Sequence, residues 1–299
     1  MHDMLTLSKL TVSLNLHSRS HALPERLEET EHHSPPNHEE AAWVMLARAF
    51  RDRYEHTDNL KDLELQIACA AYGLTLCTTM HGDALLVIAS ALVTRHRRLH
   101  RGQDIEAAVT ILRWVDQTSG IMTSDRAMLR YEFGLALQKL FEKFGDMKNL
   151  ERSVSTLQNA VDLAPEYHPW RCRMMHILSS GHFLLHAIYG RNEDNEKHQQ
   201  FMNEAMRLCP PGNIYRASAL LGMANLRSTL FDQSGEISQL EEANALRRQA
   251  MDTCSSRTHS LCCRILGALC FSLSDLYEAR GRMEAVSYTH LTLPTNREV

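Results

Sequence analysis

A repeat of 45 residues constrains the fold of this chain more than any other feature of its sequence. Gly145, Gly190 and Gly235 are each 45 residues apart. A fixed period of this size is typical of stacked repeats, because a single small unit cannot bury its own apolar face and needs neighbours on which to pack. The same period relates an alanine column (Ala160, Ala205, Ala250), and two further glycines lie 43 residues before and 46 after the three (Gly102, Gly281).

Each repeat is expected to hold two helices joined by a short turn at the glycine. Apolar residues recur with helical spacing from Leu129 to Phe144 and again from Leu150 to Val161. No proline lies between positions 37 and 164, as expected for helices, because proline clashes with the helix backbone. An acidic or amide residue follows several of the turns, where it suits the start of a helix.

A column of small residues repeats in phase with the glycines. Each member lies 11 residues before a glycine, or before Asp58, which takes the glycine's place in the first unit. Small side chains let two helices approach closely, so we expect this column to mark a helix crossing. Its members are Ala47, Ala91, Gly134, Ser179, Ala224 and Cys270.

With Gly134 as phase marker, the third unit resembles the tetratricopeptide repeat. Ser153 and Ala160 follow seven residues apart, and Pro165 closes the unit. The repeat is longer than the usual length of about 34 residues. We therefore expect an all-α, right-handed α-solenoid of antiparallel helix pairs, with about five and a half pairs and a repeat of about 45 residues.

Three phrases look like the long tetratricopeptide-like arrays of fungal proteins. They are Phe-Glu-Lys-Phe-Gly-Asp (141–146), Val-Asp-Leu-Ala-Pro-Glu-Tyr-His-Pro (161–169) and Leu-Gly-Met-Ala-Asn-Leu (221–226). Such arrays often precede a caspase-like CHAT domain, so the resemblance implies that this chain could be a fragment of a larger protein of that type.

The ends of the chain depart from the repeat. We predict an N-terminal extension or degenerate repeat end over residues 1–38, and the array itself over residues 39–284. Residues 285–299 are rich in threonine and β-formers, contain Pro294 and resemble translated adaptor sequence. We therefore expect this tail to be non-native and leave it out of the fold.

Composition favours a soluble, cytoplasmic protein. Of 299 residues, 44% are hydrophobic and 23% charged, and the net charge of −4 argues against nucleic acid as a partner. The eight cysteines form no C-x-x-C pair, which is typical of free thiols in a reducing compartment. The longest apolar run, Ala84 to Val93, is too short to span a membrane. Residues 1–16 have no compact apolar core, so we expect no signal peptide there.

No residue constellation predicts catalysis, a cofactor or a metal site. His96 and His100, like His182 and His186, have the i,i+4 spacing of a metal pair, but no third ligand is fixed nearby. The stretch His81-Gly82-Asp83 has the dipeptide of caspase-like enzymes without their strands, so we expect a helix start there. There is no P-loop and no serine elbow.

The leading hypothesis is a non-catalytic scaffold that binds a protein or peptide along the first helix of each pair. One alternative is the regulatory array of a larger caspase-like peptidase or signalling nucleotide triphosphatase. Another is a metal- or phosphate-binding module built on His96, His100 and the nearby arginines, which are Arg95, Arg97, Arg98 and Arg101. An uncapped C-terminal repeat would expose an apolar face, through which we expect self-association. The predicted concave-face residues are Ile88, Leu92, Arg95, His96, Tyr131, Leu135, Gln138, Lys139, His176, Ser180, Phe183, Leu184, Leu221, Asn225, Ser228 and Thr229.

Overall fold

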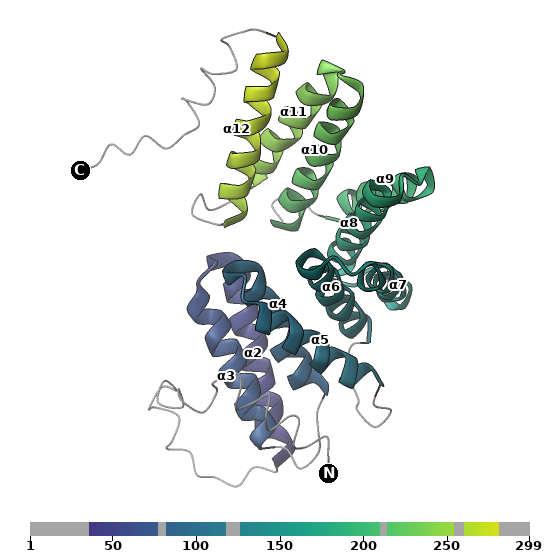
Figure 1. Cartoon of the computed structure of the whole chain (residues 1–299). Helices are drawn as coiled ribbons and strands as arrows, with labels where there is room; N and C mark the ends of the chain where they lie inside the picture. Colours follow the sequence, from purple (N-terminus) through teal and green to yellow (C-terminus); the bar gives the residue numbers. More distant parts are fainter. Residues whose placement is uncertain (1–35, 77–81, 118–125, 210–213, 254–259, 281–299) are drawn as a thin grey trace, which may run out of the picture. The chain divides into compact units, whose positions relative to one another are not determined.

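The computed structural model describes residues 36–76, 82–117, 126–209, 214–253 and 260–280, and these residues form eleven α-helices and no strand. The helices follow one another as antiparallel pairs (Figure 1). This confirms the all-α helical-repeat fold, whereas the right-handed twist stays a prediction. The helices are α2 Pro36–Thr57, α3 Leu60–Thr75, α4 Gly82–Leu99, α5 Gly102–Gln117, α6 Arg126–Phe144, α7 Met147–Leu163, α8 Arg171–Tyr189, α9 Asn192–Leu208, α10 Ile214–Ser234, α11 Ile237–Thr253 and α12 Ser260–Arg280.

The chain divides into two compact units, residues 1–156 and 157–299. In the first unit each of α2 to α5 packs on the next helix, and the first helices of successive pairs, α2, α4 and α6, also pack on one another. In the second unit α8 to α12 pack in the same way, with α8, α10 and α12 as the first helices. Residues 1–35 of the extension predicted over residues 1–38, and the tail from residue 285, lie outside the described residues. Helix α2 begins at Pro36, within the predicted extension.

Left-handed residues end the first helix of each pair. Asp58, His100, Gly145, Gly190 and Gly235 have positive φ, at intervals of 42, 45, 45 and 45 residues. The backbone N–H of each donates to the carbonyl four residues earlier at 2.7–2.8 Å, which closes the last helical turn. The turns predicted at the three glycines are therefore confirmed.

The expected marker of the second repeat was wrong by two residues. His100 adopts the left-handed conformation, and Gly102 is the first residue of α5. Eleven residues before His100 lies Ala89, which is fully buried and replaces Ala91 in the small-residue column. Gly281 lies outside the described residues.

Hydrogen bonds at two members of the small-residue column, Gly134 and Ser179, confirm that the two helices of a pair cross there. Ser153 Oγ on α7 donates to the carbonyl of Gly134 on α6 at 2.7 Å. In the next pair, Ser179 Oγ on α8 donates to the carbonyl of His198 on α9 at 2.8 Å. Both contacts join residues 19 positions apart, so the two pairs cross in the same register.

Consecutive repeats are joined by arginines at the start of the first helix. Arg171 Nη1 donates to the carbonyls of Val161, at 2.7 Å, and of Ala164 at the end of α7. Arg216 Nη1 donates to the carbonyls of Met206 and Cys209 at the end of α9, at 3.0 and 2.8 Å. Each arginine therefore satisfies carbonyls that the preceding helix leaves unpaired. Arg126 lies 45 residues before Arg171, but the segment preceding it is outside the described residues.

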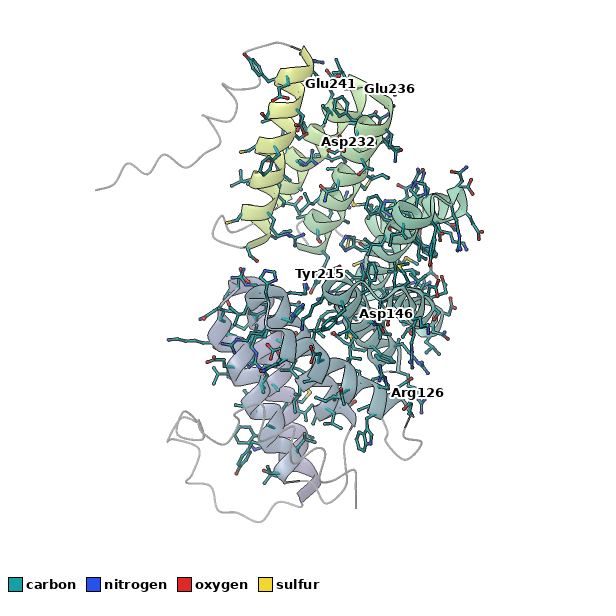
Figure 2. The ribbon with its side chains drawn as sticks, viewed as in Figure 1. Arg126, Asp146, Tyr215, Asp232, Glu236 and Glu241 are labelled. Atoms are coloured by element: carbon teal, nitrogen blue, oxygen red, sulfur yellow. The ribbon has the colours of Figure 1, made fainter. Side chains whose placement is uncertain are left out.

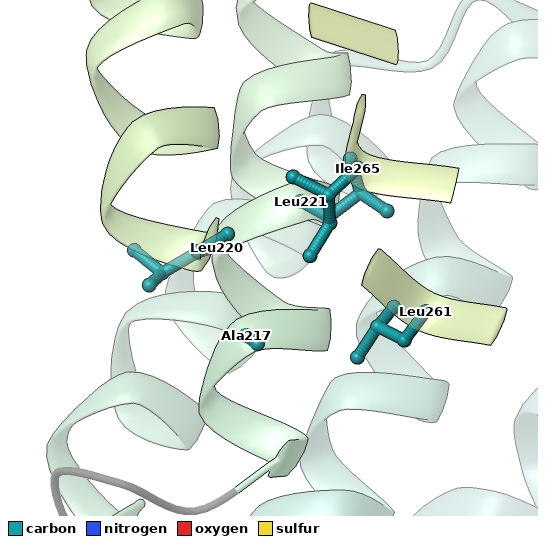
Figure 3. Packing of buried hydrophobic residues seen from close by; sticks show 6 residues of the cluster. Ala217, Leu220, Leu221, Leu261 and Ile265 are labelled. Carbon is teal, nitrogen blue, oxygen red and sulfur yellow. The ribbon is translucent and has the colours of Figure 1, made fainter. Parts of the chain in front are cut away.

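The core of the second unit lies where α10, α11 and α12 meet. Its buried apolar residues come mainly from α10 and α12 (Figure 3). By length and mean hydropathy, 1.3 over its best window, α12 would also be able to cross a membrane. A single such helix is weak evidence for a span, because core helices meet the same criteria. The core residues are Ala217, Leu220, Leu221, Ala250, Leu261 and Ile265.

Candidate functional site

The second-repeat candidates follow the wrong register. Ile88, Leu92, Arg95 and His96 were placed from Gly102, but the turn lies at His100. Ile88 and Leu92 are buried among the helices of the first unit. Their burial corrects the expectation that they face a partner. The positions equivalent to the candidates of the other repeats are Leu86, Ser90, Val93 and Thr94, of which only Thr94 is not buried.

Arg95 and His96 have contacts within their own repeat. The Arg95 guanidinium donates to both carboxylate oxygens of Asp104 at 2.9 and 2.7 Å. His96 Nδ1 donates to the carbonyl of Arg101 at 2.9 Å. Both contacts join α4 to the start of α5, so they hold the turn between the helices.

The third-repeat candidates lie mostly inside the first unit. Tyr131, Leu135 and Gln138 on α6 are buried, which corrects the expectation of an accessible row at these positions. Lys139 Nζ forms an ion pair with Glu142 on the same helix at 2.6 Å. In the first unit the first-helix surface is therefore largely filled by packing.

The fourth and fifth repeats leave the same register accessible. We call the set of candidates that are not buried there the α8–α10 face. On α8 its members are half-buried, and on α10 Asn225 is exposed while the other two are half-buried; Leu221 is the buried candidate. The α8–α10 face consists of His176, Ser180, Phe183, Leu184, Asn225, Ser228 and Thr229.

Close packing brings the two halves of this face together. A Cβ on Gly222 of α10 would lie 3.4 Å from His176 Nε2 of α8 and 3.0 Å from the end of the Met202 side chain, so α10 packs tightly against these two side chains at Gly222. The Phe183 ring packs toward His198 of α9, with ring centroids 5.3 Å apart. Phe183 and Leu184 supply the apolar part of the α8–α10 face, and α10 supplies polar side chains.

A buried arginine of α11 supports the polar strip. Arg247 is only 3% exposed, and its Nη2 donates to Asn225 Oδ1 at 3.3 Å and to Ser228 Oγ at 2.9 Å. Burial lowers the pKa of the Arg247 guanidinium, with the charge of Asp275 opposing the shift. Because Asn225 accepts through Oδ1, its Nδ2 donor is directed away from Arg247.

Several buried polar atoms of α11 and α12 lack a hydrogen-bond partner among the described residues. They are Nε and Nη1 of Arg247, both amide atoms of Asn244 and the Ser272 hydroxyl, all at least nine-tenths buried. Burial, with the charges of Asp232 and Glu278, raises the pKa of Asp275, and Arg247 opposes this. Figure 2 shows Asp232 near the opposite end of α10 from Tyr215. Burying the unpaired atoms of Arg247, Asn244 and Ser272 therefore lowers the free energy of unfolding.

Sequence reasoning missed Arg247 because it searched only the first helix of each pair. The signal is present in the repeat, since the equivalent position is apolar in the other four second helices. Counted 12 residues from each left-handed residue, these positions are Ala70, Leu112, Leu157 and Met202. Arg247 is the exception in an otherwise apolar column.

A serine and two histidines between α8 and α9 have the residue types of a hydrolase site but not its geometry. His198 Nδ1 donates to the Ser179 carbonyl at 3.0 Å, so this nitrogen holds a proton and cannot take one from the Ser179 hydroxyl 2.7 Å away. His182 Nδ1 donates instead to Asp194 Oδ1 at 2.9 Å. Ser179 is fully buried, so these contacts join α8 to α9.

The histidine pairs considered as metal ligands take part in turns. His186 Nδ1 donates to the Arg191 carbonyl at 2.9 Å, as His96 does to Arg101. The ring centroids of His96 and His100 are 6.5 Å apart. Within the described ranges, no three His, Cys, Asp or Glu side chains form a group that could hold a metal ion.

No protein-family model and no curated protein matches this sequence. Among solved structures, the chain is similar to BtubC (BKLC) from P. vanneervenii at 13% identity, over 86% of this chain and 89% of that one, with a TM-score of 0.46. It is also similar to the S. pombe nuclear import adaptor Nro1 at 15% identity, over 97% and 94% of the two chains, with a TM-score of 0.36. The designed helical repeat protein DHR64 matches at 14% identity, over 83% and 100%, with a TM-score of 0.27.

Proposed function

We propose that this chain is a non-catalytic interaction scaffold that binds a peptide segment or a domain of a partner protein along the α8–α10 face. The observation that supports this most is the change in burial along one register. Positions filled by packing in α4 and α6 are accessible in α8 and α10. Exposed side chains on neighbouring helices of a repeat protein are the usual place for a partner to bind.

The chemistry of the face matches a peptide with both an apolar side chain and an accessible backbone. Phe183 and Leu184 offer apolar surface, and Asn225 offers an amide donor oriented by Arg247. An oriented asparagine amide pairs with a backbone carbonyl. Arg247 places a buried charge beneath this face, at a position that is apolar in the other repeats. Such departures from good packing are found at functional sites.

Selection from a peptide display library on the full chain tests this proposal. Peptides that bind the wild type are titrated against Leu184→Ser and Asn225→Ala. We expect each variant to weaken binding about 10-fold, which corresponds to about 1.4 kcal/mol. The matched control is Gln199→Ala, an exposed residue of the second helix α9, which should change affinity by less than about twofold.

Circular dichroism of each variant establishes that the helices are intact. If the selected peptides bind all four proteins equally, or lose affinity only in Gln199→Ala, the partner surface lies elsewhere and the proposal fails. If no peptide is selected at micromolar affinity, a peptide partner is excluded. A partner domain is then tested with the same variants.

The finer hypotheses stay predictions. A regulatory array of a larger caspase-like peptidase or signalling nucleotide triphosphatase requires a further domain after Glu284, which sequencing of the native transcript would reveal. Cytoplasmic location is part of our proposal and is checked by fractionation. Self-association through the C-terminal repeat also stays a prediction. It would use α12, whose Phe271 is 78% exposed, and sedimentation of the full chain at several concentrations tests it.

A further inference from the structure

Trp170, Arg173 and Tyr215 gather at the starts of α8 and α10. Trp170 immediately precedes α8, Arg173 is the third residue of that helix, and Tyr215 is the second residue of α10 (Figure 2). The Arg173 Cζ atom lies 4.7 Å from the centroid of each aromatic ring, and the two centroids are 6.0 Å apart. Arg173 Nη1 also donates to Tyr215 Oη at 2.8 Å. We call these three residues the Trp–Arg–Tyr cluster.

The cluster combines a repeated feature with a single addition. Trp170 and Tyr215 are 45 residues apart, so they are equivalent positions of two successive repeats. The position on α10 that is equivalent to Arg173 is Ser218. An aromatic side chain therefore recurs at the start of both first helices, and Arg173 adds a charge that contacts both rings.

The cluster continues the α8–α10 face toward the starts of its helices. Arg173 lies seven residues before Ser180, so the two residues share one face of α8. On α10, Tyr215, Gly222 and Thr229 follow one another at the same spacing of seven. All three cluster residues are half-buried, so part of each side chain is accessible from solvent.

The contacts of Arg173 prepare its guanidinium for a carboxylate. A guanidinium that stacks on aromatic rings directs its N–H groups along its own plane, where they match the two oxygens of a carboxylate. Contact with two rings also restricts the Arg173 side chain before a partner arrives, so less conformational entropy is lost on binding. Tryptophan, tyrosine and arginine are the residue types that dominate binding hot spots.

The starts of α8 and α10 carry a net positive charge. Arg171, Arg173 and Arg216 lie in the first turns of the two helices, where neither helix has an acidic residue. The segment 164–170 before α8 adds one acidic residue, Glu166. Arg171 and Arg216 bind backbone carbonyls, and these contacts leave their charges in place. A partner with complementary charge at this end is therefore acidic.

We propose that the Trp–Arg–Tyr cluster recognises an acidic side chain of the partner peptide, whose carboxylate pairs with Arg173. This inference rests on the proposed function, because it assigns one part of the peptide to one end of the surface that includes the α8–α10 face. The apolar part of the peptide then contacts Phe183 and Leu184 further along α8.

The length of α8 between these two contacts sets the spacing in the peptide. Leu184 lies 11 residues after Arg173 on the same helix, which corresponds to about 16 Å at a rise of about 1.5 Å per residue. An extended peptide rises about 3.3 Å per residue. We therefore expect Asp or Glu about five residues from an apolar residue in the peptides that bind.

Peptides selected on the full chain from the display library test this assignment. They are synthesised with amidated C-termini, so that side chains supply the carboxylates, and their affinities are measured by isothermal titration calorimetry. Replacing the peptide's acidic residue by its amide should weaken binding to the wild-type chain about 10-fold. This comparison uses only wild-type protein, so it does not depend on the folding of a variant.

A double-mutant cycle then locates the partner of the carboxylate. Arg173→Gln should weaken binding of the acidic peptide about 10-fold and change binding of the amide peptide by less than about twofold. The matched control is Arg207→Gln, an exposed arginine of α9 whose Nη2 pairs with Glu204 at 2.6 Å. It should leave both affinities unchanged, and circular dichroism checks the helices of both variants.

Two kinds of failure are distinguishable. If Leu184→Ser and Asn225→Ala weaken binding but the acidic and amide peptides bind equally, the face binds a peptide and the assignment of its acidic residue is wrong. The same holds if Arg173→Gln weakens both peptides alike, or if the selected peptides lack an acidic residue. If neither Leu184→Ser nor Asn225→Ala weakens binding, or if no peptide is selected, the peptide-binding function fails and this inference fails with it.

Discussion

Arg247 Nη2 on α11 donates to Ser228 Oγ on α10 at 2.9 Å, from a side chain that is almost entirely buried. The guanidinium lies in a column that is apolar in the other four repeats. This contact joins the α8–α10 face to a buried charge that lowers the stability of the fold. A substitution of Arg247 should therefore change stability and peptide binding in opposite directions.

Replacing Arg247 by leucine should stabilise the protein while weakening peptide binding. Leucine occupies the equivalent position at Leu112 and Leu157. Removal of a buried charge with unpaired nitrogens is expected to raise the free energy of unfolding by about 1–3 kcal/mol. Urea titrations compare Arg247→Leu with Arg248→Leu, an exposed neighbour expected to change little. A loss of stability in Arg247→Leu would mean that the guanidinium is well paired in the folded chain.

The left-handed turns can be tested with two glycines in opposite conformations. Gly190 has φ +67, and Gly267 lies inside α12; neither would bring a Cβ within 4 Å of another group. Gly190→Ala should therefore cost about 1–2 kcal/mol from backbone strain alone. Gly267→Ala should instead stabilise by about 0.5–1 kcal/mol. Equal effects in thermal melts would contradict the assigned backbone at Gly190.

The helix crossing at Gly134 should be sensitive to both polarity and size. Ser153→Ala removes the buried hydrogen bond to the Gly134 carbonyl and should cost about 1 kcal/mol. Ser155→Ala on the exposed side of the same helix is the control and should cost nothing. Gly134→Trp should destabilise by about 1–3 kcal/mol or more through overpacking. An unchanged melting temperature in Gly134→Trp would show that the column is not a crossing.

Stability should fall on mild acidification because of His198. Burial lowers the pKa of His198 from its ordinary value of 6.5, with a hydrogen bond to Ser179 opposing and the charges of His182 and His186 adding. The unfolded chain therefore binds a proton at a higher pH than the folded chain. The free energy of unfolding should decrease as the pH falls through about 6.5, until the folded form is also protonated. His198→Gln should remove this component in melts from pH 8 to 5.

Much of the fold could be predicted because local geometry determines the residue types of the repeat. A left-handed turn favours glycine and a helix crossing favours small residues, so both recur in the sequence at a fixed interval. The prediction misplaced the second repeat because the left-handed conformation favours glycine, which stands at position 102, whereas His100 is the residue that adopts it. The interval of 45 residues back from Gly145 ends at His100, so the period was a better guide than residue type.

The site was harder to predict than the fold. Helical spacing places Tyr131 and His176 at equivalent positions, yet one is buried and the other half-buried. That difference depends on how neighbouring helices pack, which the register of a single helix does not contain. Arg247 was missed for a related reason. Only a comparison of the second helices with one another shows that it is a charged residue at an otherwise apolar position.

Arg171 and Arg216 also decide where this array could be cut and rejoined. Each belongs by sequence to one helical hairpin but completes the end of the preceding one. A hairpin such as α8–α9, excised from the start of its first helix to the end of its second, would lose the cap that the next first helix encodes. Modules for transplantation or insertion should therefore begin a few residues inside the first helix and end after the following arginine, so that each exchanged piece of 45 residues brings its own closing contact.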